Sequence, residues 1–169
     1  MKKFSIDEVH SSFEILTRML INKQLKIAVM ESCTSGLVAS LITDTEGASA
    51  VFKGSDVTYS NEAKIAAGVS ESVINSYGVY SKETAIAMAQ SEKDRFLVDI
   101  SGGITGSLGN VDPMNKDSIP GEADFAILYK EQVCSYHISI PNGLNRFESK
   151  LFIAYEFCNE LLKLFGYEN

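Results

Sequence analysis

Residues 25–36 read L-K-I-A-V-M-E-S-C-T-S-G, a short apolar segment followed by small hydroxyl, thiol and glycine residues. The apolar part, residues 25–30, is typical of a strand in the middle of a sheet. The polar part leads into residues 36–43, which we interpret as a helix. A strand followed directly by a helix is the repeating unit of α/β proteins, so this stretch decides the fold class.

The rest of the chain extends this pattern. Ser5 and Glu8 form a capping box before a helix over residues 5–22, whose apolar residues recur at steps of three and four. Later segments sort into helices and strands, and the late pair of strands has the short connection of a hairpin. Helices are expected at 61–68, from 70 or 72 to 78, from 81 onward and at 145–165, and strands at 51–52, 55–59, 97–101, 124–130 and 133–140. The sequence therefore predicts an α/β fold, with a mixed sheet covered by helices on both faces.

Length and composition exclude several classes of protein. The 169 residues suit one domain, and 45% of them are hydrophobic, which argues against disorder. The net charge of −7 with scattered basic residues gives nucleic-acid binding little support. Three widely spaced cysteines and two distant histidines indicate neither a disulfide framework nor a metal site. No apolar run is long enough for a membrane span and no secretory signal opens the chain, so we expect a cytoplasmic protein. We also expect it to use no metal and no cofactor.

Ser32 is a candidate nucleophile because of its place between a strand and a helix. Ligands of α/β sheets bind beyond the carboxyl ends of strands, where the next helix presents free N–H groups. The amides near Thr34–Gly36 would then hold an oxyanion. A capped helix start rich in serine and threonine, without any chemistry, is the commoner explanation of such a cluster.

A serine nucleophile needs a base, and Lys64 is one candidate. It lies early in the helix capped by Ser60, among Ala63, Ile65 and Ala66, where burial would favour the neutral amine. Tyr59 ends the preceding strand and could face the same cleft. A solvated surface lysine and a rim tyrosine would explain the same residues.

Two further possibilities remain open at this level. Cys33 could be the nucleophile with His137 as its base, although Cys33 is better placed to point into the core. The glycine-rich segment 102–122 reads as one long irregular loop, which could wrap a ligand or simply be a flexible connection.

Four blocks of sequence resemble one known family. M-E-S-C-T-S-G at 30–36, G-A-S-A-V-F at 47–52, V-T-Y-S-N-E-A-K at 57–64 and G-V-Y-S at 78–81 are similar to the CinA C-terminal domain, the nicotinamide-nucleotide amidase family. The resemblance covers nearly the whole chain. It implies that residues 1–169 form one CinA C-terminal-like amidase domain. It implies a three-layer α/β/α sandwich, commonly a homodimer. It also implies hydrolysis of the carboxamide of nicotinamide mononucleotide to nicotinate mononucleotide and ammonia.

The resemblance also implies roles for single residues. The family's nucleophile falls on Ser32, its base on Lys64 and its assisting tyrosine on Tyr59. The positions expected to bind the nucleotide amide are Thr34, Ser35, Gly36, Asn61, Gly103, Thr105 and Arg146.

The sequence departs from the family in its second half and at one position of the first block. Ser35 replaces a glycine, and S-G-G-I-T-G-S stands where the family has T/S-G-I-A-G-P. D-P-M-N-K-D-S-I-P-G-E-A-D replaces a glycine-rich stretch with K-P-V-G-T, and Arg146 is displaced by one residue. These departures motivate an alternative prediction, a catalytically attenuated CinA-like protein that binds a nucleotide or a partner.

Overall fold

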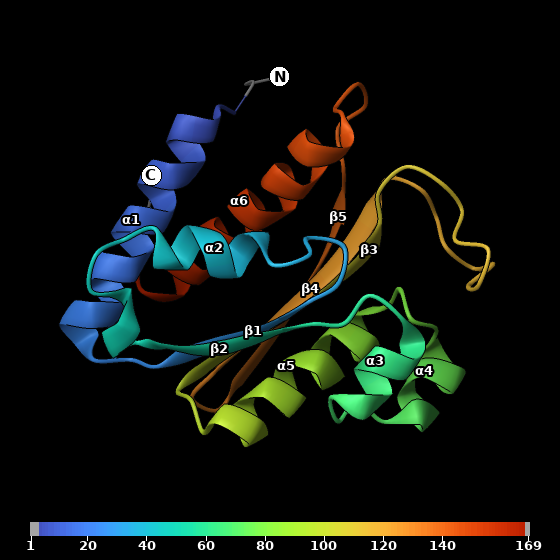
Figure 1. The fold of residues 1–169 in the computed structure, drawn as a ribbon, viewed down its shortest axis with the longest axis horizontal. Helices are drawn as coiled ribbons and strands as arrows, with labels where there is room; N and C mark the ends of the chain where they lie inside the picture. Colours follow the sequence, from blue (N-terminus) through green and yellow to red (C-terminus); the bar gives the residue numbers. More distant parts are fainter. Residues whose placement is uncertain (1–3, 168–169) are drawn as a thin grey trace.

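Five strands form one mixed sheet in the order β2-β1-β3-β4-β5 in the computed structural model, which describes residues 4–167 (Figure 1). Residues 1–3, which include Lys2 and Lys3, lie outside the described part, as do residues 168–169. β1 runs parallel to β2 and β3, whereas β3, β4 and β5 are antiparallel neighbours. The strands are β1 (Ile27–Glu31), β2 (Phe52–Val57), β3 (Ile100–Ser107), β4 (Glu122–Tyr129) and β5 (Gln132–Ser139).

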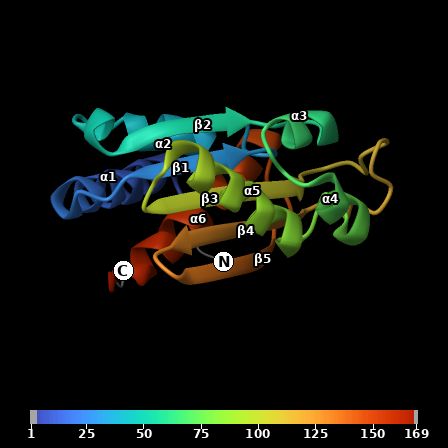
Figure 2. The ribbon, with the colours of Figure 1, turned by 90° about the horizontal axis from the view of Figure 1, so that it is seen from below.

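Helices cover both faces of this sheet, which confirms the predicted three-layer α/β/α sandwich (Figures 1 and 2). One face carries α1 (Ile6–Lys23), α2 (Leu37–Thr43) and α6 (Arg146–Leu164). The other carries α3 (Asn61–Ala66), α4 (Glu71–Tyr77) and α5 (Lys82–Phe96), and the 3-10 turn η1 (Ala48–Ala50) precedes β2. Within residues 4–167 no helix combines the length and apolar content needed to cross a bilayer.

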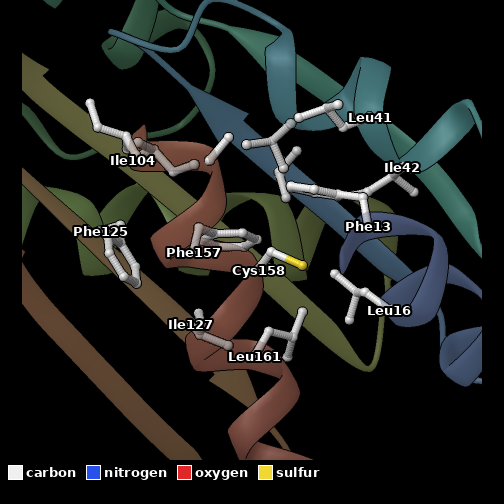
Figure 3. Packing of buried hydrophobic residues seen from close by; sticks show 14 of the residues in the cluster. Phe13, Leu16, Leu41, Ile42, Ile104, Phe125, Ile127, Phe157, Cys158 and Leu161 are labelled. Carbon is white, nitrogen blue, oxygen red and sulfur yellow. The ribbon is translucent and has the colours of Figure 1, made fainter. Parts of the chain in front are cut away.

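The helices begin where the sequence places their caps. The capping box of Ser5 and Glu8 is formed, and Asn145 and Glu148 make a second one at the start of α6. Because α1 and α6 then turn their apolar stripes toward the sheet, they bury a continuous core (Figure 3). Its labelled members include Phe13 and Leu16 of α1, Phe125 of β4, and Phe157 and Leu161 of α6.

Strand β3 corrects the prediction of a loop over residues 102–122. The strand continues through its glycines to Ser107, and only the following residues are irregular. A Cβ on Gly102 would collide with the ring of Phe157, and one on Gly103 with the backbone of α5 at Ala85. The glycines therefore let helices of both layers approach the sheet closely, a contact that no local sequence pattern reveals.

Candidate active site

Ser32 follows β1 directly, at the edge of the sheet where β1 and β3 both end. Its backbone N–H donates to the carbonyl of Ile104 at 2.9 Å, which extends the parallel pairing by one residue. The chain then turns sharply, because Ser35 and Gly36 have φ values of 50° and 91°. The Ser35 N–H closes this turn on the Ser32 carbonyl at 3.1 Å. Ser32 is thus held at a fixed position, with its side chain facing α3.

The buried carboxylate of Glu31 fastens the turn to α2. It accepts hydrogen bonds from the backbone N–H groups of Gly36, Val38 and Ala39 at 3.0, 3.1 and 2.9 Å. The start of α2 is therefore already occupied by an anion, which complements its partial positive charge. This corrects the expectation that the amide of Gly36 would hold an oxyanion.

Two amides of the turn face the Cys33 sulfur and have no backbone acceptor among the described residues. Within residues 4–167, the N–H groups of Cys33 and Thr34 donate to no backbone carbonyl. They follow Ser32 immediately, so they are the backbone donors closest to it in the chain. Hydrogen-bond donors next to a nucleophile are the usual components of an oxyanion hole.

Lys64 meets Ser32 in the interior. Its Nζ donates to Ser32 Oγ at 3.0 Å and to the carbonyl of Thr58 at 2.7 Å, and the side chain is only 2% exposed. Burial lowers the pKa of Lys64 from 10.5 to about 8, against the opposing influence of Cys33 and Asp112. A substantial fraction of the amine is therefore neutral near physiological pH and able to accept a proton.

The segment between β2 and α3 brings this lysine to the serine. The Thr58 N–H donates to the Glu31 carbonyl at 2.8 Å, which continues the pairing of β2 with β1. The side chain of Ser60 then caps α3 by accepting from the Ala63 N–H. Lys64 lies in the next position of this short helix, so two local backbone features fix its reach.

A cavity of about 320 Å³ opens beside Ser32. Tyr59 and Arg146 stand at its exposed rim, where the Arg146 guanidinium donates to the Tyr59 hydroxyl at 2.8 Å. Tyr59 therefore faces the predicted cleft, but in residues 4–167 its only hydrogen bond is to Arg146. The cavity is lined by Ser32, Cys33, Tyr59, Tyr80, residues 106–113 and Arg146.

A hydrogen-bonded network holds the loop that forms one wall of this cavity. Asp112 accepts from the hydroxyl of Tyr80 at 2.6 Å and from the side chain of Asn115 at 2.7 Å. Asn115 in turn accepts from the side-chain amide of Asn61 at 2.9 Å. Asn61, predicted to bind substrate, thus holds the loop from outside the cavity lining.

Three predicted substrate-binding residues of the turn also lie elsewhere. Gly36 gives its N–H to Glu31, and the hydroxyl of Ser35 accepts from Lys150 of α6 at 2.5 Å. Thr34 is 1% exposed, and its hydroxyl has no partner among the described residues. The side chains of Thr34 and Ser35 therefore contact the surrounding protein and do not line the cavity.

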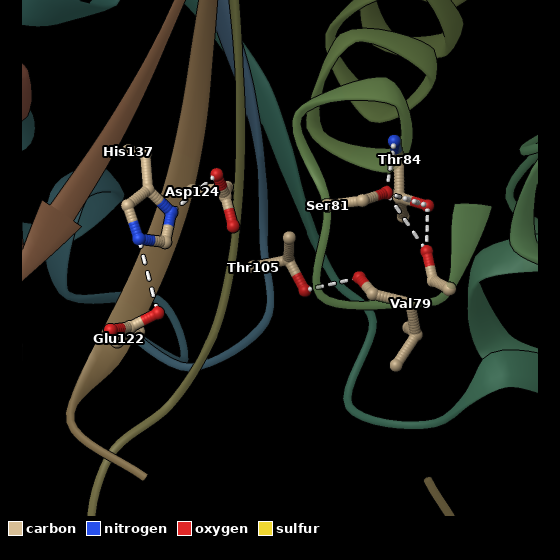
Figure 4. Close-up of polar contacts among 8 residues, drawn as sticks. Val79, Ser81, Thr84, Thr105, Glu122, Asp124 and His137 are labelled. Atoms are coloured by element: carbon tan, nitrogen blue, oxygen red, sulfur yellow. Dashed lines mark hydrogen bonds and ion pairs between the residues drawn. The ribbon is translucent and has the colours of Figure 1, made fainter. Parts of the chain in front are cut away.

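Gly103 and Thr105, also predicted to bind substrate, likewise lie outside the cavity lining. Gly103 is covered by α5, and the Thr105 hydroxyl donates to the carbonyl of Val79 at 2.9 Å (Figure 4). Thr105 is fully buried, so its role is to join β3 to the segment before α5. The same figure shows Ser81 and Thr84 completing the turn into that helix.

The alternative pair of Cys33 and His137 is also wrong. Cys33 packs in the core on the α6 side of the sheet, and burial raises the pKa of its thiol to about 12. His137 lies on β5, three strands away from β1, between the carboxylates of Asp124 and Glu122 (Figure 4). Neither group can therefore serve the other.

Three residues that sequence reasoning left without a role belong to the site. Glu31 and Tyr80 stood inside the quoted blocks 30–36 and 78–81, so their positions were in view. Their partners, the amides of α2 and the carboxylate of Asp112, were not. Asp112 lies where the sequence departs from the family, and no pattern pointed to it.

These features define an α/β protein with a buried serine–lysine pair at the carboxyl edge of its parallel strands. Comparison with known proteins identifies the family of this fold. The model of the CinA C-terminal domain matches residues 10–160, so the chain belongs to this family. A CinA-like protein from Fervidobacterium nodosum is 38% identical over 133 residues, 78% of this chain and 30% of the relative. One from Leptospira borgpetersenii is 42% identical over 98 residues, 57% of this chain and 23% of the relative.

Solved structures show the same fold. A CinA superfamily protein from Escherichia coli has a TM-score of 0.84 at 24% identity, with 97% of this chain and 94% of that chain covered. A competence/damage inducible protein from Agrobacterium tumefaciens has a TM-score of 0.80 at 26% identity, with 97% and 99% covered. The matches to the two CinA-like relatives span less than a third of their length, so they concern one part of those proteins.

Proposed function

We propose that this domain is a serine–lysine amidase that hydrolyses the carboxamide of nicotinamide mononucleotide. The observation that carries the proposal is the 3.0 Å contact between Lys64 Nζ and Ser32 Oγ in a buried setting. A hydroxyl becomes a nucleophile when a neutral base accepts its proton, and the lowered pKa of Lys64 supplies such a base. The nucleotide amide as substrate comes from the family resemblance.

We propose the following course for the reaction. Lys64 takes the proton of Ser32 while Oγ attacks the carboxamide carbon, and the carbonyl oxygen becomes an oxyanion. The amides of Cys33 and Thr34 stabilise that oxyanion. Lys64 then gives its proton to the amide nitrogen, the C–N bond breaks and ammonia leaves. Water, deprotonated by Lys64, hydrolyses the acyl-enzyme ester and restores Ser32.

Arg146 gives the exposed end of the cavity a positive charge. A guanidinium presents paired N–H donors that match a phosphate group, so we assign Arg146 to the phosphate of the nucleotide. Tyr59 keeps Arg146 at the rim through its hydroxyl. Its proton-assisting role in the reaction stays a prediction, as do the homodimer and the cytoplasmic location.

The test is ammonia release from nicotinamide mononucleotide by the wild type, Ser32→Ala and Lys64→Ala. We expect turnover by the wild type and losses of about 10⁴-fold or more in kcat/KM in both variants, because nucleophile and base act as a unit. Ser40→Ala and Lys53→Ala are matched controls, since both residues are exposed and lie on α2 and β2 away from the cavity. They should retain full activity.

Equal ammonia release by the wild type and both site variants would overturn the proposal. Absence of turnover in the wild type, with saturable binding of the nucleotide in a calorimeter, would favour the alternative of a binding protein. The altered segment 102–122 and the displaced Arg146 are the features that motivate that alternative.

A further inference from the structure

Asp112 is the one acidic residue in the cavity lining among residues 4–167. Both of its oxygens accept hydrogen bonds, Oδ2 from Tyr80 and Asn115 and Oδ1 from the Met114 N–H at 2.9 Å. These donors stabilise the ionised form and lower the pKa of Asp112. Within residues 4–167 it forms no ion pair. The cavity therefore contains a fixed negative charge that no described cationic side chain pairs with.

Asp112 and Arg146 line the cavity from different segments, the loop after β3 and the start of α6. The negative charge of Asp112 raises the pKa of Lys64, so this carboxylate lies within electrostatic reach of the amine. Arg146 instead contacts Tyr59 at the exposed rim. A ligand that fits both would carry a positive charge near the reacting carboxamide and a negative charge farther out.

An aromatic ring accompanies the carboxylate. Tyr80 also lines the cavity, and its hydroxyl is fixed by the 2.6 Å bond to Asp112. The ring is half-buried and anchored in the segment before α5, where Val79 is tied to Thr105. Aromatic faces and carboxylates both attract flat organic cations.

We propose that Asp112, together with Tyr80, makes this site selective for a carboxamide carried on a cationic ring. The inference rests on the proposed function and names its substrate class, an oxidised pyridinium nucleotide as opposed to the uncharged dihydropyridine form. Oxidised and reduced nicotinamide mononucleotide share the carboxamide, the ribose and the phosphate, and differ in the ring charge. Only the oxidised form gains from the Asp112 carboxylate.

The experiment compares kcat/KM for ammonia release from the oxidised and the reduced mononucleotide at one pH. We expect the wild type to prefer the oxidised form by about tenfold, the size of one partly desolvated cation contact. Asp112→Asn should bring that preference close to one, and Asp112→Glu should retain most of it. Asp117→Asn is the matched control, because Asp117 lies in the same loop, is exposed and does not line the cavity.

The ratio of the two substrates separates selectivity from general damage. A shifted loop or a changed pKa of Lys64 would change both rates by the same factor, so an equal change on both substrates in Asp112→Asn contradicts the inference. Equal rates in the wild type contradict it too, while leaving the amidase proposal intact. If the wild type hydrolyses neither substrate, the amidase proposal fails, and the ratio of dissociation constants from calorimetry decides the inference in its place. An Asp112-dependent preference for the oxidised form supports it, and equal affinities contradict it.

Discussion

The floor and the wall of the cavity are built in different ways. The turn after β1 and the segment from Thr58 to Lys64 lie beneath the cavity, and we call them its floor. They contribute Ser32, Cys33 and Tyr59 to the lining, with Lys64 behind Ser32, and backbone pairing with neighbouring strands holds both. The wall, residues 108–121, leaves the sheet and is held mainly by side chains around Asp112. A rigid floor suits the reacting groups, which tolerate little displacement. A wall on a loop can change without disturbing them.

This difference parallels the match to the family. The blocks that resemble the CinA C-terminal domain supply most of the floor, whereas the longest departure, residues 112–124, falls mainly on the wall. Ser35, residues 101–107 and Arg146 also depart from the family but lie outside the wall. We infer that the type of reaction depends on the floor and the choice of substrate on the wall. The predictions below test whether the two regions are as separable as this comparison implies.

The largest effect concerns the pH dependence of the floor. Because only the neutral form of Lys64 accepts the Ser32 proton, kcat/KM of the wild type should rise about tenfold per pH unit below about pH 8 and then level off. Initial rates of ammonia release between pH 6 and 9.5 measure this profile. Asp112→Asn should move the midpoint to lower pH, because the Asp112 charge favours the protonated amine. A flat profile in the wild type would contradict the role of Lys64 as base.

Glu31→Gln tests the rigidity of the floor, with a smaller expected effect. The glutamine keeps the size but offers one acceptor oxygen, so at least one of the three N–H bonds of α2 is lost along with the negative charge. We expect a loss of about 2–4 kcal/mol in the free energy of unfolding and about 10- to 100-fold in kcat. Urea unfolding and steady-state kinetics measure the two quantities.

Two comparisons make this result specific. Glu46→Gln, at an exposed glutamate shortly after α2, should change neither quantity. The midpoint of the pH profile in Glu31→Gln should stay near that of the wild type, because the variant displaces the nucleophile and leaves the base in place. Wild-type stability and activity in Glu31→Gln would show that the turn does not depend on this carboxylate.

The floor could be predicted from the sequence, and much of the wall could not. Ser32 and Lys64 stand beside local signals, a strand end and a serine cap, and such signals depend on neighbours in the chain. The glycines of β3 were interpreted as a loop because their reason, close approach of α5 and Phe157, comes from residues far away in sequence. Asp112 is understandable only through Tyr80, 32 positions earlier.

Glu31 shows the same limit inside a recognised motif. Its place after a buried strand was visible, yet a carboxylate that turns forward onto the next helix cannot be told from a surface glutamate by pattern alone. Likewise, Thr105 and Gly103 stood in a plausible glycine-rich segment. Their orientation toward α5 depends on the register of β3 against β4, which the sequence does not specify.

The smallest expected effect concerns Glu92 of α5, the helix that packs against β2. It is fully buried on α5 near Asp56 of β2, and neither oxygen has a hydrogen-bond donor among the described residues. Burial, together with the charge of Asp56, raises the pKa of Glu92 from 4.5 to about 8. The folded protein therefore keeps this proton where the unfolded chain loses it, and stability should fall as pH rises from about 4.5 to 8.

Glu92→Gln removes this dependence without removing the side chain. We expect the variant to equal the wild type near pH 5 and to exceed it by about 1 kcal/mol at pH 8.5, because a buried charge without donors is no longer formed. Urea unfolding at both values measures the difference, with Glu83→Gln on the exposed side of α5 as the matched control. Asp56 precedes Thr58 by two residues on the strand that leads to Lys64. If the wall and the floor are separable as proposed, Glu92→Gln changes the free energy of unfolding but not the ratio of rates on oxidised and reduced substrate. A changed ratio would show that the two regions are coupled through β2.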